Sequence, residues 1–249
     1  MMIGAGFVAT AQDDHLLLLA PASPITVNPL THEKLTYDPA DLIPISEATE
    51  VYVGITVPAS MKVNSLDEFV ALARSQPGKL NWAATPGSTY LTFAAFQKSE
   101  NLPVANVPYR DIVQAQNDLA QERIHLMMCA IAIVQPQILA GNLKLLAVAN
   151  ADRAAMAPDI PTVREAGYPA LELSSSVGFF GSPVMSRALR ERISADIRAV
   201  ATDREIAKRL LATGQMLRAS TAQEFAALIE SQRAHFADLA RAIGLRPGE

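Results

Sequence analysis

Short apolar runs alternate with amphipathic segments through the first two thirds of the chain. Residues 16–20 and 51–57 are apolar or β-branched and each run is followed by a proline, so we expect two buried strands. Further short apolar runs predict strands at residues 80–84, 106–109, 124–128 and 143–149. Strands that alternate with helices are typical of α/β domains.

Helices are marked by capping residues and by apolar positions at helical spacing. Ser65 and Glu68 have the spacing of a capping box at the start of a helix, and the Gln-Pro-Gly sequence at residues 76–78 ends that helix. The same kind of periodicity predicts helices at residues 90–98 and 113–121.

The last third of the chain predicts mainly helices. One helical stripe carries four apolar residues, Leu189, Ile193, Ile197 and Val200. A second helix is expected at residues 205–211, with Gly214 just beyond its end. Thr221 and Glu224 then form a second capping box ahead of a long amphipathic segment. A helical tail therefore follows a strand-rich middle.

Length and charge narrow the class of protein. The chain has 249 residues, more than one usual compact domain, so two lobes or one large α/β unit are expected. Its net charge is −4 and no block of basic residues stands out, which argues against binding to nucleic acid or to an anionic membrane surface. No apolar run approaches the ~20 residues that span a bilayer.

No residue pattern predicts a catalytic, metal or cofactor site. Gly4 and Gly6 formally fit a dinucleotide-binding motif, but that motif needs a preceding strand, so we interpret them as small residues at a helix start. The four histidines are scattered, and the chain has neither an H-E-x-x-H nor a G-x-S-x-G motif. Cys129 lies in an apolar run, where burial raises a thiol pKa and makes the thiol inert. We therefore expect neither an enzyme nor a cofactor.

The remaining candidate is the sequence Thr-Pro-Gly-Ser-Thr-Tyr at residues 85–90, between a predicted strand and a predicted helix. Hydroxyl groups, a conformationally permissive glycine and the free amides of a helix N-terminus together suit an anionic ligand. The same residues are also typical of an ordinary helix N-cap. The residues alone leave both interpretations open.

Several motifs follow one another along the whole chain. Asn28-Pro29-Leu30 precedes the sequence Tyr-Asp-Pro-Ala-Asp-Leu-Ile-Pro-Ile at residues 37–45. Further blocks lie at residues 76–81 (Gln-Pro-Gly-Lys-Leu-Asn), 107–110 (Val-Pro-Tyr-Arg), 140–148 (Ala-Gly-Asn-Leu-Lys-Leu-Leu-Ala-Val) and 158–167 (Pro-Asp-Ile-Pro-Thr-Val-Arg-Glu-Ala-Gly). In this order and spacing the chain resembles the substrate-binding proteins of tripartite tricarboxylate transporters, also called the Bug family.

The resemblance implies an α/β, two-lobed periplasmic-binding-protein-like fold with a cleft between the lobes. Lobe I would comprise residues 1–56 and 177–249, and lobe II residues 57–176. The ligand would be a small carboxylate, namely a dicarboxylate, a tricarboxylate, an aromatic carboxylate or an acidic amino acid. The resemblance also implies membrane transporter subunits as partners and a periplasmic location.

Members of this family hold carboxylates largely through neutral donors, at loops that lead into helices. The matching positions of this chain are Ser23 in lobe I and, in lobe II, Thr85, Gly87, Ser88 and Thr89. We expect Ser88→Ala and Thr89→Ala to weaken ligand binding and to leave the fold intact.

The chain also departs from the family pattern. Arg110-Asp111 stands where Lys-Gly is usual, Cys129 where an Asp is usual, and Ser176 where an aromatic residue is usual. The resemblance implies that the chain begins at the segment that follows the family's signal peptide and first βα unit. Two hypotheses follow. One is a carboxylate-binding receptor; the other is a truncated, degenerate copy with no transport role, at most a structural or interaction protein, and cytoplasmic if this start is genuine.

Overall fold

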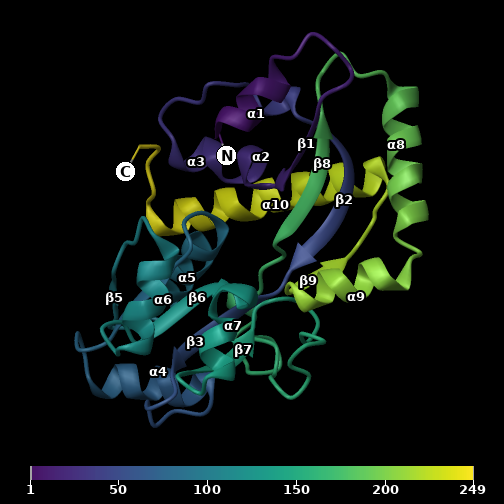
Figure 1. Ribbon diagram of the computed structural model, residues 1–249. Coiled ribbons are helices and arrows are strands. Elements are labelled where there is room, and N and C mark those ends of the chain that lie inside the picture. Colours follow the sequence, from purple (N-terminus) through teal and green to yellow (C-terminus); the bar gives the residue numbers. More distant parts are fainter. Residues whose placement is uncertain (1, 249) are drawn as a thin grey trace. The chain divides into compact units, whose positions relative to one another are not determined.

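The computed structural model describes residues 2–248, which form two compact units (Figure 1). Unit 1 contains the described residues up to Val51 and those from Ser175 onward, and unit 2 contains residues 52–174. The chain thus leaves unit 1 once and returns to it once. From the sequence, we expect the chain to pass from lobe I to lobe II near residue 57 and to return near residue 177. Strand β3 (Val53–Pro58) pairs with strands of unit 2, so its residues belong to that unit.

Unit 1 is built on a four-stranded sheet in the order β1-β8-β2-β9. Its strands are β1 (Leu17–Pro21), β2 (Ile43–Val51), β8 (Ser176–Gly181) and β9 (Gln215–Leu217). Each pairing in this sheet is antiparallel. Strand β1 confirms the strand expected at residues 16–20, whereas β2 and β9 were not expected from the apolar pattern.

Helices of unit 1 cover this sheet. They are α1 (Met2–Ala9), α2 (Ser23–Thr26), α3 (Asn28–Thr31), the 3₁₀ helix η1 (Pro39–Asp41), α8 (Arg187–Val200), α9 (Arg204–Ala212) and α10 (Ala222–Ile243). Figure 1 shows α10 running across the sheet, and it packs against β2 and α2. The capping box predicted for Thr221 and Glu224 is confirmed, because each side chain accepts a hydrogen bond from the other residue's backbone N–H. Gly4 and Gly6 lie within α1.

The core of unit 1 depends on a close approach between α10 and β8. The rings of Phe180 and Phe225 lie 5.3 Å apart, and both side chains are fully buried. A Cβ atom at Gly178 would clash with the Phe225 ring, so only glycine allows this packing. The sheet and the longest helix of unit 1 are therefore joined through two aromatic rings and one glycine.

Helix α8 turns a different face toward unit 1 than its apolar stripe predicted. The residues of that stripe are at most half-buried, and Val200 is exposed, whereas Ser194 is buried. The Ser194 hydroxyl donates a hydrogen bond to the Ser220 carbonyl and accepts one from the Arg198 guanidinium. The face of α8 that meets the rest of unit 1 is therefore polar.

Unit 2 is built on a five-stranded sheet in the order β5-β4-β6-β3-β7. Its strands are β3, β4 (Asn81–Ala84), β5 (Ala105–Asn106), β6 (Leu126–Ala130) and β7 (Leu143–Val148). Strand β4 is parallel to β5 and β6, whereas β3 is antiparallel to β6 and β7. The strand expected at residues 106–109 is limited to β5, since Pro108 has no N–H group to donate to a neighbouring strand.

Helices connect the strands of unit 2. They are α4 (Leu66–Ser75), α5 (Ser88–Ser99), α6 (Ile112–Ala120), α7 (Ile131–Leu139) and the 3₁₀ helix η2 (Pro169–Leu171). Ser65 caps α4 as predicted, but the Glu68 carboxylate accepts its hydrogen bond from the backbone of Asn64. None of the helices within residues 2–248 is long and apolar enough to cross a membrane.

Candidate functional site

Three parallel strands of unit 2 end at the same edge of the sheet, and each is followed by a helix. Strands β5, β4 and β6 are neighbours in the sheet, and they lead into α6, α5 and α7 (Figure 1). The Thr85 N–H donates to the carbonyl of Met128, 3.2 Å away, and so joins the end of β4 to the end of β6. Small ligands bind at this edge in open sheets of parallel strands, because strand ends and helix N-termini converge there.

The turn between β4 and α5 is shaped by Gly87. This residue has φ 108° and ψ −133°, a conformation that L-residues rarely adopt. It occupies the N-cap position of α5, and no side chain caps that helix. The N–H groups of the first helical turn, at Ser88, Thr89 and Tyr90, have no acceptor within the helix. The turn therefore offers backbone donors to an anion.

The hydroxyl groups of this turn have different roles. Thr89 is buried, and its hydroxyl donates to the Thr85 carbonyl, so the Thr85 hydroxyl donates in turn to the Thr89 oxygen, 2.8 Å away. Both protons are therefore used inside the turn. The Ser88 hydroxyl is half-buried and has no hydrogen-bond partner among residues 2–248. Of the predicted side-chain donors in unit 2, Ser88 is the one whose proton is available to a ligand.

Aromatic packing holds α5 on β4. The Trp82 ring is fully buried, stacks on Tyr90 with centroids 5.8 Å apart, and contacts Phe93. The indole N–H of Trp82 donates to the side chain of Gln97 at 2.9 Å. Since Trp82 lies on β4 and its partners lie on α5, the first turn of the helix is fixed relative to the strand end.

Of the two neighbouring strand ends, the one followed by α6 is less available to an anion. Asp111 accepts a hydrogen bond from the Val113 N–H at 2.8 Å, so the N-terminus of α6 is already capped by a carboxylate. At the end of β6, Cys129 is fully buried, and burial raises the pKa of its thiol to about 12. The expected burial of this thiol is therefore confirmed. Helix α7 begins next to it without a side-chain cap.

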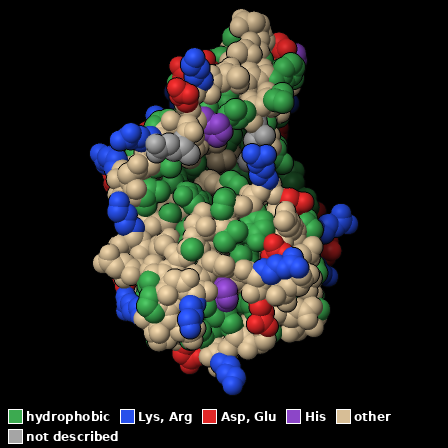
Figure 2. Space-filling model, turned by 90° about the vertical axis from the view of Figure 1, so that its left-hand side faces the viewer, with side chains coloured by type: hydrophobic (Ala, Val, Ile, Leu, Met, Phe, Trp, Pro, Cys, Tyr) green, Lys and Arg blue, Asp and Glu red, His purple; other side chains and the backbone are tan. Residues whose placement is uncertain are grey.

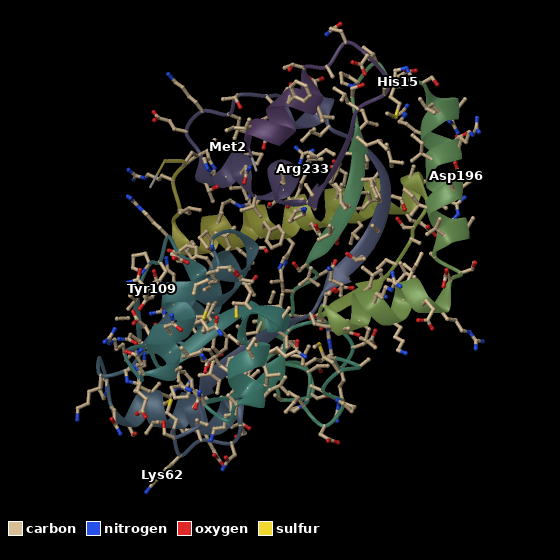
Figure 3. All side chains as sticks on the ribbon, viewed as in Figure 1. Met2, His15, Lys62, Tyr109, Asp196 and Arg233 are labelled. Carbon is tan, nitrogen blue, oxygen red and sulfur yellow. The ribbon has the colours of Figure 1, made fainter. Side chains whose placement is uncertain are left out.

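Tyr109, which follows β5 and is labelled in Figure 3, holds neighbouring segments together through its hydroxyl group. Its hydroxyl donates to the Asp118 carboxylate at 2.8 Å, and Arg123 donates to the other carboxylate oxygen at 2.9 Å. Burial and the Asp118 carboxylate raise the pKa of Tyr109 to about 12, so its hydroxyl stays protonated. This network joins the segments before and after α6 to the last turn of that helix.

Ser23, the predicted site residue of unit 1, is the first residue of α2, directly after β1. The Ala22 N–H donates to the Ser176 carbonyl at 3.0 Å, and the Tyr37 hydroxyl donates to the Pro24 carbonyl at 2.9 Å. These bonds fix the loop on β8 and on the segment that precedes η1. The Ser23 hydroxyl is half-buried and has no hydrogen-bond partner in the described part of the chain.

No metal-binding group of side chains accompanies these loops in the described residues. Within residues 2–248, no three His, Cys, Asp or Glu side chains lie close enough together to hold a metal ion. Lys and Arg side chains are spread over the face seen in Figure 2 instead of gathering in one place. The donors of both loops are hydroxyl and amide groups, which can bind an anion by directed hydrogen bonds.

Residues 1–245 match the family described as TctC, tripartite tricarboxylate transporter family receptor. The chain belongs to this family. It is a family of receptors and not of enzymes, as the absence of catalytic motifs predicted. Curated relatives are 24–29% identical. The UPF0065 protein in the tcbD-tcbE intergenic region of Pseudomonas sp. (strain P51) is 28% identical over 200 residues, which cover 79% of this chain and 60% of that protein. Protein BugT of Bordetella pertussis is 29% identical over 164 residues, which cover 64% of this chain and 50% of that protein.

Solved structures show the same fold. The TctC chain matches R. palustris Rpa4515 with adipate at a TM-score of 0.88 and 24% identity, covering 99% of this chain and 84% of the other. It matches periplasmic binding protein BugD at a TM-score of 0.81 and 23% identity, covering 99% of this chain and 84% of the other. It matches MatC from Rhodopseudomonas palustris with bound malate at a TM-score of 0.77 and 21% identity, covering 96% of this chain and 84% of the other. The expected two-lobed α/β fold of periplasmic binding proteins is confirmed.

Proposed function

We propose that this TctC-family chain binds a small carboxylate through the turn between β4 and α5. The proposal rests on Gly87 and Ser88, where a helix N-terminus without a side-chain cap adjoins a hydroxyl that has no partner among residues 2–248. A carboxylate placed there would accept hydrogen bonds from backbone N–H groups, and the helix dipole favours its negative charge.

The residues of the turn would have two roles, either donating hydrogen bonds to the carboxylate or positioning the donors. The amides that follow Gly87 and the Ser88 hydroxyl would donate to the ligand, and Gly87 supplies the backbone conformation that exposes them. Thr85 and Thr89 would position these donors, since their own hydroxyl protons stay within the turn. Ser23 of unit 1 is proposed as a further hydroxyl donor to the carboxylate, because its hydroxyl is likewise unpartnered among residues 2–248.

Neutral donors are sufficient for such a ligand. Hydrogen bonds to an ionised carboxylate are shorter and about twice as strong as those between neutral groups. Adipate and malate accompany two proteins that share this fold, and both are dicarboxylates. The ligand class is therefore proposed to be dicarboxylates first, with tricarboxylates, aromatic carboxylates and acidic amino acids as the wider set.

The proposal includes a role in transport. The chain would act in the periplasm and pass its carboxylate to the membrane subunits of a tripartite tricarboxylate transporter. Its membership of a receptor family supports this role. The alternative is a degenerate copy without a transport role, at most a structural or interaction protein. The two differ in one measurable property, since only the receptor needs to bind the carboxylate.

Isothermal titration calorimetry with adipate, malate, citrate, benzoate and glutamate tests the proposal. We expect at least one of these to bind at a one-to-one ratio. At a concentration 100-fold above its dissociation constant, that ligand should add ~2.7 kcal/mol to the free energy of unfolding. If none of the five binds, and none raises the thermal midpoint, the receptor hypothesis is wrong and the degenerate copy is favoured.

A further inference from the structure

A second concave site lies wholly within unit 1, between α8, the start of α10 and the start of β2. This groove has a volume of about 500 Å³, within the usual range for small-molecule pockets. We call it the arginine groove, because its walls carry three arginines against a single glutamate: Arg187, Arg190, Arg198 and Glu191. Neither Ser23 nor the β4–α5 turn contributes to its lining.

The arginines lie on one face of α8. Arg187, Arg190, Ser194 and Arg198 are three or four residues apart, so their side chains leave the helix on the same side. Ser194 is the buried residue at the centre of this face. The stripe of α8 that faces unit 1 is thus basic, which explains why the apolar stripe remains only half-buried.

Two of the three guanidinium groups have no carboxylate partner within ion-pairing distance among residues 2–248. Arg187 pairs with Glu191 at 2.7 Å, but both side chains are exposed and such a pair contributes little. Arg198 donates to the Ser194 hydroxyl at 2.9 Å. Hydrogen bonds from Thr221 lower the pKa of Glu224, and the charge of Arg198 adds to this. The Glu224 carboxylate itself accepts hydrogen bonds from Thr221.

Arg190 gives the strongest indication that the groove binds an anion. Its Nε atom is buried and has no hydrogen-bond acceptor in the described part of the chain. A buried donor without an acceptor is unfavourable, and an Arg donor binds anionic oxygen most strongly. The opposite wall is the first turn of α10, with Thr221, Ala222 and Gln223, where the helix dipole also favours negative charge.

We propose that the arginine groove binds a small molecule with two or more anionic oxygen groups, either phosphates or carboxylates. The guanidinium groups of Arg190 and Arg198 would hold the anionic groups, and Arg187 would add charge at the rim. This site is independent of the carboxylate turn in unit 2, so this chain would bind two anions at separate places.

Titration calorimetry with pyrophosphate and, separately, citrate tests the groove and tells phosphate from carboxylate chemistry. The variants are Arg190→Gln and Arg198→Gln, and the matched control is Arg192→Gln, an exposed arginine of α8 that does not line the groove. We expect one of the two anions to bind wild type and Arg192→Gln equally. Its affinity should fall at least about tenfold in each groove variant, because a charge-assisted hydrogen bond is lost.

A further arm uses Ser88→Ala, which alters the proposed carboxylate turn and should leave binding in the groove unchanged. Circular dichroism confirms that each variant is folded. The proposal is overturned if neither pyrophosphate nor citrate binds, or if binding is unchanged in both groove variants. It is also overturned if a peptide rich in Glu binds the groove and the small anions do not, because the site would then be a protein interface.

Discussion

The hydroxyl oxygens of Thr85 and Thr89 lie 2.8 Å apart across the turn that joins β4 to α5. The Thr89 hydroxyl also donates to the Thr85 carbonyl, so the two side chains close the turn on itself. Ser88, between them, keeps its hydroxyl free of any partner among residues 2–248. The turn therefore separates residues that hold its shape from the residue that can donate to a ligand.

Ser88→Ala should weaken carboxylate binding by ~1–3 kcal/mol, because one hydrogen bond to a charged acceptor is lost. The thermal midpoint without ligand should not change, since the hydroxyl makes no bond within the described chain. The measurement is titration with the tightest carboxylate of the panel. Ser99→Ala, at the other end of α5, is the matched control. Equal affinity of wild type and Ser88→Ala would show that the hydroxyl does not contact the ligand.

Thr89→Val should mainly lower stability, in contrast to Ser88→Ala. Valine keeps the shape of the buried side chain but removes both hydrogen bonds to Thr85. The Thr85 carbonyl then lacks this donor, and we expect the free energy of unfolding to fall by ~1–3 kcal/mol. Urea denaturation measures this loss. A variant as stable as the wild type would contradict the positioning role of Thr89.

Gly87→Ala should destabilise unit 2 although the site has room for a methyl group. A Cβ atom at this position meets nothing within 4 Å, so the cost is one of backbone conformation alone. For a residue other than glycine, such a conformation costs ~1–3 kcal/mol. Urea denaturation and carboxylate titration should both show a loss. Full stability with full affinity would mean that the turn does not need its glycine conformation.

Glu47 should make stability depend on pH. Burial raises the pKa of its carboxyl above its ordinary value of 4.5, the charge of Glu50 adds to this, and Ser176 and Arg218 oppose it. Above pH 4.5 the unfolded chain loses this proton while the folded protein still holds it. The contribution of Glu47 is therefore present at low pH and is lost as the pH rises through the folded-state pKa, with a slope of at most about 1.4 kcal/mol per pH unit.

The variant Glu47→Gln has no titrating group at this position, so it should lose that part of the pH dependence. Denaturation series between pH 4 and pH 8 compare the two proteins, with Glu33→Gln, an exposed glutamate, as the control. The account of Glu47 is wrong if wild type and Glu47→Gln change in parallel across this range.

The sequence predicts the elements whose signals are local. A short apolar run that ends in a proline predicts strand β1. The capping box of Thr221 and Glu224 predicts the start of helix α10. Strand β2 gives no such signal, because its buried positions include Glu47 and Glu50. Glu50 is a buried residue whose carboxylate accepts a hydrogen bond from Arg218, 168 positions away.

The candidate site shows the same limit. Its position follows from the sequence, since residues 85–90 contain the strand end, the glycine and the helix start together. The different roles of Ser88 and Thr89 do not, because both carry hydroxyl groups and only the fold decides which one finds an acceptor. The arginine groove could not be predicted from the sequence, because α8 and the start of α10 meet only in the folded unit.

A nuclear magnetic resonance titration shows which backbone amides the carboxylate contacts. The backbone amides are followed in ¹⁵N-labelled protein while adipate or the tightest carboxylate of the panel is added. We predict that the largest shifts occur at Ser88, Thr89 and Tyr90, with saturation at the dissociation constant from calorimetry. Saturable shifts that leave these three amides unchanged, and appear instead at Ala222 and Gln223, would contradict carboxylate binding by the β4–α5 turn.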